Sequence, residues 1–246
     1  MTSLAQLPGA DRLIVALDVP TVDEALRAVE ELDNVSFFKV GLQLFVTGGL
    51  ATLLQSLRGK RVFVDLKLPG DIGNTISAVI DVCVAHGVEF LTLSESMPPA
   101  AIRSAATARN AHGSSPLKLL TVPFLSSLDV DDLAEMTDGA DDLETYLLKR
   151  AKRAVTAGCD GVIASGDAIA WCRSAFPHPT LVVSPGIRPA GAAADDQKRH
   201  TTPAEAISLG ADYLVVGRPI LRAPDRRAAA SRVIAEIDAA LKARVG

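Results

Sequence analysis

The feature that most constrains the fold of this sequence is a regular alternation of short apolar runs with longer amphipathic stretches. Eight runs are mostly apolar, which is typical of parallel strands that are buried on both faces. They occupy residues 12–17, 37–40, 61–66, 89–93, 117–122, 161–164, 180–183 and 212–216. The stretches between them have the spacing of helices. The alternation therefore predicts eight consecutive strand–helix units.

Local signals mark the ends of several predicted helices. Two helices begin with a Thr that is followed three residues later by a Glu, the spacing of a capping box: Thr21 with Glu24 and Thr202 with Glu205. Glycines stand where three helices should end, in a left-handed conformation that Gly adopts at little cost: Gly87, Gly158 and Gly210. These signals place the helix boundaries independently of the strand pattern.

The length of the chain decides between two ways of arranging these units. Eight units in 246 residues leave about 31 residues for each, the size of a unit in a (β/α)8 barrel. We therefore predict a single-domain (β/α)8 TIM barrel over residues 1–246. A doubly wound open sheet is the alternative, but no GxGxxG motif follows the first strand. Residues 185–201, after the seventh strand, form a segment that is too long for an ordinary turn and is expected to be a mobile functional loop, with a tolerated surface insertion as the alternative.

Composition excludes several classes of function. The formal net charge is −4 and the chain has seven Phe, two Tyr and one Trp, so a basic, aromatic nucleic-acid surface is not expected. No apolar run reaches the ~18 residues of a membrane span, and the first residues lack the pattern of a secretory leader. We expect a cytoplasmic protein without nucleic-acid or membrane partners. Cysteines without CxxC spacing and histidines without HxH or HExxH spacing predict no metal site.

Charged residues gather at the carboxyl ends of the first three predicted strands, where barrels carry their active sites. They are Asp18, Lys39, Asp65, Lys67 and, slightly later, Asp71. Alternating ammonium and carboxylate groups keep one another ionised, because the attraction within each pair is roughly 4 kcal/mol at 4 Å and an effective dielectric near 20, before the cost of desolvation. Such a network suits the stabilisation of a carbanion followed by proton delivery. A purely structural salt-bridge cluster that closes the barrel is the alternative.

A second group of residues, after the seventh and eighth strands, predicts a phosphate site. Gly217 and Arg218 offer an accessible amide and a guanidinium that can bind two oxygens at once. Arg188 and Gln197 lie on the long loop and could close over the same group. Barrels often bind phosphate at this position.

Several motifs together resemble the orotidine 5′-phosphate decarboxylase family. The matching segments run in order along the chain: Val15-Ala-Leu-Asp18, Phe38-Lys-Val-Gly41, Val64-Asp-Leu-Lys67, Asp71-Ile-Gly-Asn-Thr75, Pro185-Gly-Ile-Arg-Pro189, Asp196-Gln197 and Val216-Gly-Arg-Pro219. The resemblance implies a carboxy-lyase that converts orotidine 5′-monophosphate to UMP in pyrimidine biosynthesis without a cofactor.

The resemblance also implies roles for individual residues. Lys67 would protonate C6 as carbon dioxide leaves, within a network completed by Asp65, Asp71 and Lys39. Contacts to the substrate would come from Asp18, Thr75, Ser126, Pro185, Arg188, Gln197, Gly217 and Arg218. Within this set, Asp18 and Lys39 would hold the ribose, Ser126 the pyrimidine edge, and Arg188, Gln197, Gly217 and Arg218 the phosphate. The family forms homodimers, in which Asp71 and Thr75 would reach the neighbouring site.

One departure from the family pattern concerns the segment after Lys67. Three residues, Leu68, Pro69 and Gly70, separate Lys67 from Asp71, where the family has two. The extra residue either forms a Pro-Gly turn that leaves Asp71 in place, or displaces Asp71 and lowers activity. Two further functions remain open: a related phosphate-binding barrel enzyme acting on sugar phosphates, and a silent barrel that binds a nucleotide as a sensor.

Overall fold

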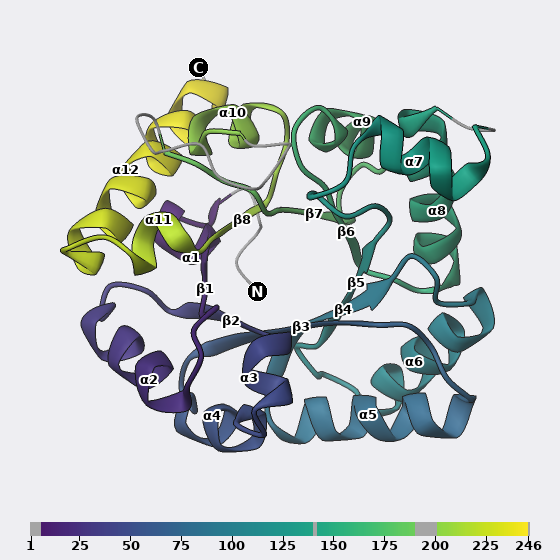
Figure 1. Ribbon diagram of the computed structural model, residues 1–246, viewed down its shortest axis with the longest axis horizontal. Coiled ribbons are helices and arrows are strands. Elements are labelled where there is room, and N and C mark those ends of the chain that lie inside the picture. The colour runs from purple at the N-terminus through teal and green to yellow at the C-terminus, as the bar shows by residue number, and fades with distance from the viewer. Residues whose placement is uncertain (1–5, 140–141, 190–200, 246) are drawn as a thin grey trace.

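The computed structural model describes residues 6–139, 142–189 and 201–245, and they form a closed barrel of eight parallel strands. The strands pair in sequence order from β1 to β8, and β8 pairs back with β1. Figure 1 views the molecule with the strands at the centre and the helices in a ring around them. The predicted (β/α)8 TIM barrel is confirmed. The extent of that single domain over residues 1–246 stays a prediction.

All eight predicted strands form, with boundaries within two residues of the expected ones. Their bounds are β1 Leu13–Ala16, β2 Phe37–Gly41, β3 Arg61–Leu68, β4 Val88–Ser94, β5 Lys118–Val122, β6 Gly161–Ile163, β7 Leu181–Ser184 and β8 Tyr213–Val216. β3 is the longest of these strands and extends past its predicted end to Leu68. This extension carries Lys67 on the strand itself.

The helices cover the outside of the barrel. Their bounds are α1 Gly9–Arg12, α2 Val22–Glu31, α3 Leu42–Val46, α4 Leu50–Ser56, α5 Gly73–Ala85, α6 Pro99–Ala111, α7 Val130–Thr137, α8 Leu143–Ala157, α9 Ala168–Ala175, α10 Pro203–Ser208, α11 Arg218–Leu221 and α12 Arg226–Val245. No helix in the described part of the chain is long and apolar enough to cross a membrane.

The cap signals hold in most places. Thr202 and Glu205 form both hydrogen bonds of a capping box, whereas at α2 the described contact is the one from the Glu24 amide to the Thr21 hydroxyl. The glycines after α5, α8 and α10 have φ values of 68°, 120° and 108°, as the left-handed prediction requires. Each of these three helices thus ends at the glycine that the sequence predicted.

Two hydrophobic cores follow from the alternation of side chains along each strand. One set points into the barrel and forms the inner core: Ile14, Ala16, Phe37, Phe63, Phe90, Leu120, Val122, Ile163, Leu181, Val183, Tyr213 and Val215. The other set, which includes Val15, Phe38 and Val64, packs against the helices. Burial on both faces explains why the strand runs are nearly continuous in apolar residues.

The two ends of the barrel are closed differently. At the lower end, where the strands begin, the rings of Phe37, Phe90 and Tyr213 pack edge to face with centroids 5.0–6.1 Å apart. The Arg61 guanidinium lies 4.2 Å from the centre of the Phe37 ring and donates to both carboxylate oxygens of Glu89, at 2.8 and 2.6 Å. These groups fill the lower end and leave the upper end, where the strands finish, for the site.

The predicted functional loop after β7 lies mostly outside the described residues, because residues 190–200 are not described. The residues at the two ends of this loop are described, and they lie next to each other. Ile187 and Thr201 form an isolated parallel bridge, and the Arg188 amide donates to the Thr201 carbonyl at 3.0 Å. The loop therefore starts and ends at one point on the rim of the barrel.

Candidate active site

A cavity of about 630 Å³ opens at the upper end of the barrel. Its walls come from the ends of strands that are far apart in the sequence. The predicted site residues that line it are Asp18, Lys39, Asp65, Lys67, Ser126, Pro185, Arg188, Gly217 and Arg218. The barrel thus brings together the charged residues of the early strands and the expected phosphate-binding residues of the late strands.

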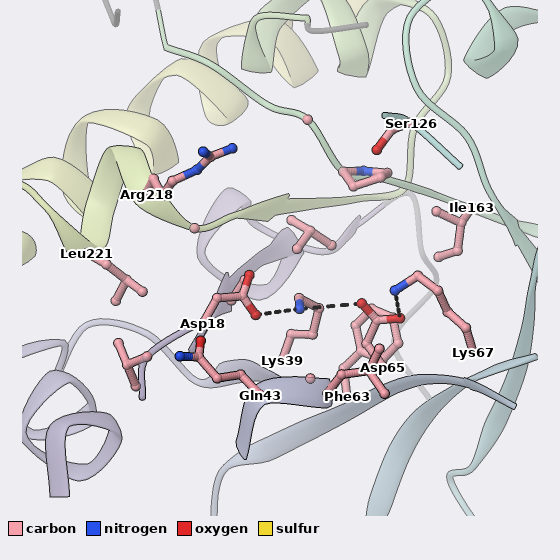
Figure 2. A pocket seen from close by; sticks show the side chains of 18 of the residues that line it. Asp18, Lys39, Gln43, Phe63, Asp65, Lys67, Ser126, Ile163, Arg218 and Leu221 are labelled. Carbon is pink, nitrogen blue, oxygen red and sulfur yellow. Dashed lines mark hydrogen bonds and ion pairs between the residues drawn. The ribbon is translucent and has the colours of Figure 1, made fainter. Parts of the chain in front are cut away.

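Four charged side chains form a continuous chain across the floor of this cavity (Figure 2). The Lys39 Nζ lies 2.9 Å from Asp18 Oδ1 and 3.4 Å from Asp65 Oδ2. The Lys67 Nζ donates to the other oxygen of Asp65, Oδ1, at 3.0 Å. The order is carboxylate, ammonium, carboxylate, ammonium, so each inner charge lies between two opposite charges.

The strand period explains why these side chains meet. Phe37 and Lys39 are two residues apart on β2, and Phe63 and Asp65 have the same spacing on β3, whereas Lys67 lies in the irregular part of β3. Side chains two residues apart point to the same face of a strand. Phe37 and Phe63 belong to the inner core, so the charged residues that follow them also point into the barrel, one layer higher.

Burial and neighbouring charge act in opposite directions on these groups. Burial disfavours the ionised form of Asp65, but the ammonium groups of Lys39 and Lys67 outweigh it and lower the pKa of this carboxyl. Burial likewise opposes the charge of Lys39, but Asp65 and Asp18 outweigh it and raise the pKa of the Lys39 amine. The two inner groups of the network, Asp65 and Lys39, are therefore ionised over a wider range of pH than the same side chains in water.

The backbone of Lys67 is in an unusual conformation. Its φ is +48°, in the left-handed region that residues other than Gly seldom occupy. The pairing of β3 with β4 shifts at this point, between Val64 and Leu68. The Lys67 amide donates to the hydroxyl of Thr92 on β4, and that hydroxyl contacts Asp65 Oδ1 at 2.8 Å.

The opposite side of the cavity is positively charged. Figure 2 shows Arg218 across the cavity from Lys67, and Gly217 and Arg188 line the same cavity. Gly217 and Arg218 stand where β8 ends and α11 begins. This arrangement places two guanidinium groups and a glycine backbone where an anionic group at one end of a ligand can bind.

An apolar wall forms a further part of the cavity lining. It consists of Phe63, Val122, Leu125, Ile163 and Val215. All of these except Leu125 are members of the inner core, and Leu125 packs against it. A flat ring with one polar edge fits such a wall, and Ser126 next to Leu125 supplies a hydroxyl for that edge.

Two cavity residues with polar side chains were missed by the sequence analysis. Gln43 in α3 and Arg222 at the end of α11 both line the cavity. Arg222 is four residues after Arg218, which is about one helical turn further along, so that spacing could have identified it. Gln43 is different, because β2 continues to Gly41 and Gln43 is the second residue of α3.

Two predicted site residues among those described do not line the cavity. Asp71 and Thr75 are exposed beyond the end of β3, and the Asp71 carboxylate accepts from the Ile72 amide at 2.6 Å. The extra residue is accommodated in the loop after Leu68, where Gly70 has a φ of +104°. A Cβ on Gly70 would come within 3.0 Å of Pro98, so this turn needs glycine. Gln197 lies outside the described residues.

Within the described ranges, no cluster of three or more His, Cys, Asp or Glu side chains could hold a metal ion. The charged network alternates acid and base, and each of its carboxylates has an ammonium neighbour. This donor set suits an anionic organic ligand better than a cation, because Lys39 and Lys67 would repel a metal ion.

Comparison with known proteins decides the family. A family model described as orotidine 5′-phosphate decarboxylase / HUMPS matches residues 11–233. The chain belongs to this family. The matched range contains β1 to β8 and every residue of the charged network.

Named relatives within the orotidine 5′-phosphate decarboxylase family agree with this assignment. The chain is 47% identical over 239 residues to orotidine 5′-phosphate decarboxylase of Rhodopseudomonas palustris (strain ATCC BAA-98 / CGA009), which covers 95% of this chain and 97% of that protein. It is 47% identical to the enzyme of Cereibacter sphaeroides, over 92% of this chain and 97% of that one. The expected enzyme class, a carboxy-lyase, is confirmed by these names.

A solved structure supports the same fold. The orotidine 5′-phosphate decarboxylase from Lactobacillus acidophilus superposes with a TM-score of 0.78 at 31% sequence identity. The match covers 93% of this chain and 99% of that one. The barrel described above is therefore shared with the family along nearly its whole length.

Proposed function

We propose that this chain decarboxylates orotidine 5′-monophosphate to UMP in pyrimidine biosynthesis, without a cofactor and with Lys67 as the proton donor. The observation that carries the proposal is the chain of alternating charges from Asp18 through Lys39 and Asp65 to Lys67 on the cavity floor. It presents an ammonium group next to a fixed carboxylate, which is the arrangement that the reaction needs. A cytoplasmic location follows as part of the same proposal.

The dimensions and chemistry of the cavity support the substrate. The phosphate is placed at Arg188, Gly217 and Arg218, far from the reacting carbon. The ribose hydroxyls are placed at Asp18 and Lys39, and the pyrimidine edge at Ser126. Binding energy at the phosphate can then be used to hold the base against the charged network, which is how remote contacts lower a barrier elsewhere.

The chemical step uses Lys67 and Asp65. The bond between C6 and the carboxylate carbon breaks, carbon dioxide leaves, and the electron pair stays on C6. The Lys67 ammonium gives a proton to C6, the amine becomes neutral, and solvent returns the proton. Asp65 accepts a hydrogen bond from the Lys67 ammonium at 3.0 Å and so orients it, and the negative charge of Asp65 lies beside the departing carboxylate. Preorganised charges of this kind stabilise the transition state without rearrangement.

The proposed enzyme is a homodimer in which Asp71 and Thr75 serve the neighbouring site. Both residues are exposed and lie outside the cavity of their own chain. The surface around them is unusually apolar, with Ile72 71% exposed and Phe45 50% exposed. An apolar groove of about 430 Å³ beside it includes Thr75, Leu66 and Phe45 among its lining residues. Large exposed apolar patches of this kind are typical of subunit interfaces.

The activity is tested by the fall in absorbance of orotidine 5′-monophosphate with purified protein. Turnover is expected for the wild type, and Lys67→Ala is expected to lose about 10³–10⁴-fold in kcat, because its proton donor is gone. Lys152→Ala on the outer helix α8 is the matched control and should keep full turnover. Tight UMP binding without turnover would instead identify a nucleotide sensor, and turnover of sugar phosphates alone a related barrel enzyme.

The shared site is tested by mixing two inactive variants, Lys67→Ala and Asp71→Asn. Subunit exchange in a symmetric dimer gives mixed dimers with one intact site each, so roughly a quarter of wild-type turnover should return. Mixing Lys67→Ala with Asp65→Asn is the control, because both changes lie on the same side and no intact site can form. Absence of recovery in the first mixture would contradict a shared site.

A further inference from the structure

Thr92 on β4 is a fully buried polar residue that contacts the charged network from below without lining the cavity. Its hydroxyl makes two hydrogen bonds to the same short segment of β3. It accepts from the Lys67 amide at 2.9 Å, and it donates to Asp65 Oδ1 at 2.8 Å. Thr92 therefore binds both members of the Asp65–Lys67 pair, namely the backbone amide of Lys67 and the side-chain carboxylate of Asp65.

The pairing of β3 and β4 explains why a side chain is needed here. Val64 pairs with Leu91 and Leu68 with Leu93, so three residues of β3 face Thr92 alone. The strand bulges at this point, and Lys67 takes up its left-handed conformation with φ of +48°. The Lys67 amide is thereby bound by a hydroxyl where a regular ladder would use a carbonyl.

The direction of the two hydrogen bonds is determined by chemistry. An amide can only donate and an ionised carboxylate can only accept. The single proton of the Thr92 hydroxyl must therefore point at Asp65. Threonine is also branched at Cβ and has few rotamers available, so its hydroxyl is held in one position.

We propose that Thr92 is a positioning residue for Lys67: it stabilises the left-handed backbone at Lys67 and fixes the Asp65 carboxylate that orients the Lys67 ammonium. The inference rests on the proposed function, since Lys67 is the proton donor there. It predicts that losing the hydroxyl lowers the rate of the chemical step much more than it weakens ligand binding. The reacting nitrogen would be misplaced, while the phosphate and ribose contacts on the other strands would remain.

The test compares Thr92→Val, which keeps the shape and removes the hydroxyl, with Thr92→Ser, which keeps the hydroxyl. We expect Thr92→Val to lose about 100-fold in kcat, the size of effect seen when a reacting group is misplaced by about 1 Å. Its Kd for UMP, measured by calorimetry, should stay within about threefold of the wild type. Thr92→Ser should recover to within about fivefold of wild-type kcat.

Thr121→Val is the matched control, because Thr121 is equally buried but lies on β5 between two inner-core residues and so faces the helices. Its kcat should remain within about twofold of the wild type. A kcat for Thr92→Val within threefold of the wild type, a parallel loss of UMP affinity, or a failure of serine to recover activity would each overturn the proposal.

The rate of amide hydrogen exchange at Lys67, followed by NMR, tests the same proposal by a measurement that does not depend on catalytic turnover. Exchange should be at least about tenfold faster in Thr92→Val than in the wild type or Thr121→Val, because the amide has lost its acceptor. Unchanged exchange would overturn the proposal. Should the wild type fail to turn over orotidine 5′-monophosphate, the proposed function fails, while this measurement still decides whether Thr92 holds the Lys67 backbone.

Discussion

The two ends of this barrel both carry partly buried ion pairs, but the surroundings of these pairs differ. At the lower end, Arg61 binds Glu89 through two parallel hydrogen bonds and stacks on Phe37, and aromatic rings fill the space around it. At the upper end, Lys39 and Lys67 contact carboxylates beside an open cavity. A guanidinium that is paired and enclosed by rings stabilises the fold, whereas an ammonium group beside a cavity can also contact a ligand.

The difference shows that burial and pairing alone do not identify a functional charge. Glu89 raises the pKa of the Arg61 guanidinium against the opposing effect of burial, much as Asp65 and Asp18 do for the amine of Lys39. What separates the two pairs is access from a cavity. Removing a charge at the upper end should therefore cost activity, and removing one at the lower end should cost stability.

Among the substitutions that test this comparison, the largest effect is expected from Lys39→Met at the upper end. Removing the cation between Asp18 and Asp65 should lower kcat/KM by about 10³-fold, because two carboxylates then face each other across the site. The free energy of unfolding should change by less than about 1.5 kcal/mol, since water in the cavity can solvate the carboxylates. The same substitution at Lys118, which lies 3.5 Å from Asp160 at the lower end, is the control and should leave turnover intact.

The second effect is expected at the lower end. Arg61→Met leaves Glu89 without its guanidinium partner and should lower the free energy of unfolding by about 3 kcal/mol. The folded fraction should keep kcat within about threefold of the wild type. Denaturant unfolding and steady-state kinetics at low temperature measure both quantities. In the double variant Arg61→Met/Glu89→Leu, part of the lost stability should return, since no unpaired charge remains. A large loss of kcat in Arg61→Met would contradict the assignment of the lower ion pair to stability alone.

A smaller effect is the pH dependence of stability that arises from the ion pairs at the upper end. Asp65 has a pKa below its ordinary value, so its contribution to stability is complete above about pH 4 and is lost as pH falls through the pKa of the folded state. Lys39 has a raised pKa, so its contribution is complete below about pH 10 and is lost as pH rises further. Between about pH 4 and pH 2, the wild type should therefore lose stability faster than Asp65→Asn. Parallel curves would contradict the assigned pairing.

The smallest effect concerns Gly41, which follows Lys39 on β2. Its backbone is extended, with φ of −115°, so any residue could adopt it, but a Cβ would lie 3.2 Å from Lys39 Nζ and 3.3 Å from Asp18 Oδ1. Gly41→Ala should lower kcat/KM by about three- to tenfold, by separating this ion pair by a few tenths of an ångström. Gly41→Ser should cost more than Ala, and an equal effect of both would argue against crowding.

Much of the site could be predicted because it depends on local pattern. The strands are short and apolar, and charges such as Lys39 and Asp65 interrupt them at a spacing of two after inner-core residues. In a closed parallel barrel the carboxyl ends of all strands lie on one rim, so the residues at the strand ends include most of the charged residues that line the cavity. Gln43 and Arg222 were missed because they belong to the helical segments that follow the strand ends, Gln43 to α3 and Arg222 to the end of α11.

Other features depended on contacts that no local pattern contains. The sequence of β4 alone does not reveal that Thr92 faces a bulge in β3, because that depends on the register between two strands. Nor does it reveal the left-handed backbone of Lys67, which is stabilised by that neighbour. The positions of Asp71 and Thr75 outside their own cavity also depend on the path of the chain after β3.

The sequence by itself determined the order of the elements, the barrel, and the identity of the charges on its rim, because the periods of strands and helices are local properties of the chain. Only the tertiary structure decided which of those charges touch, which oxygen of Asp65 binds which lysine, and which buried hydroxyl holds Lys67 in place. Those contacts depend on distances between strands, and such distances exist only when the barrel has closed.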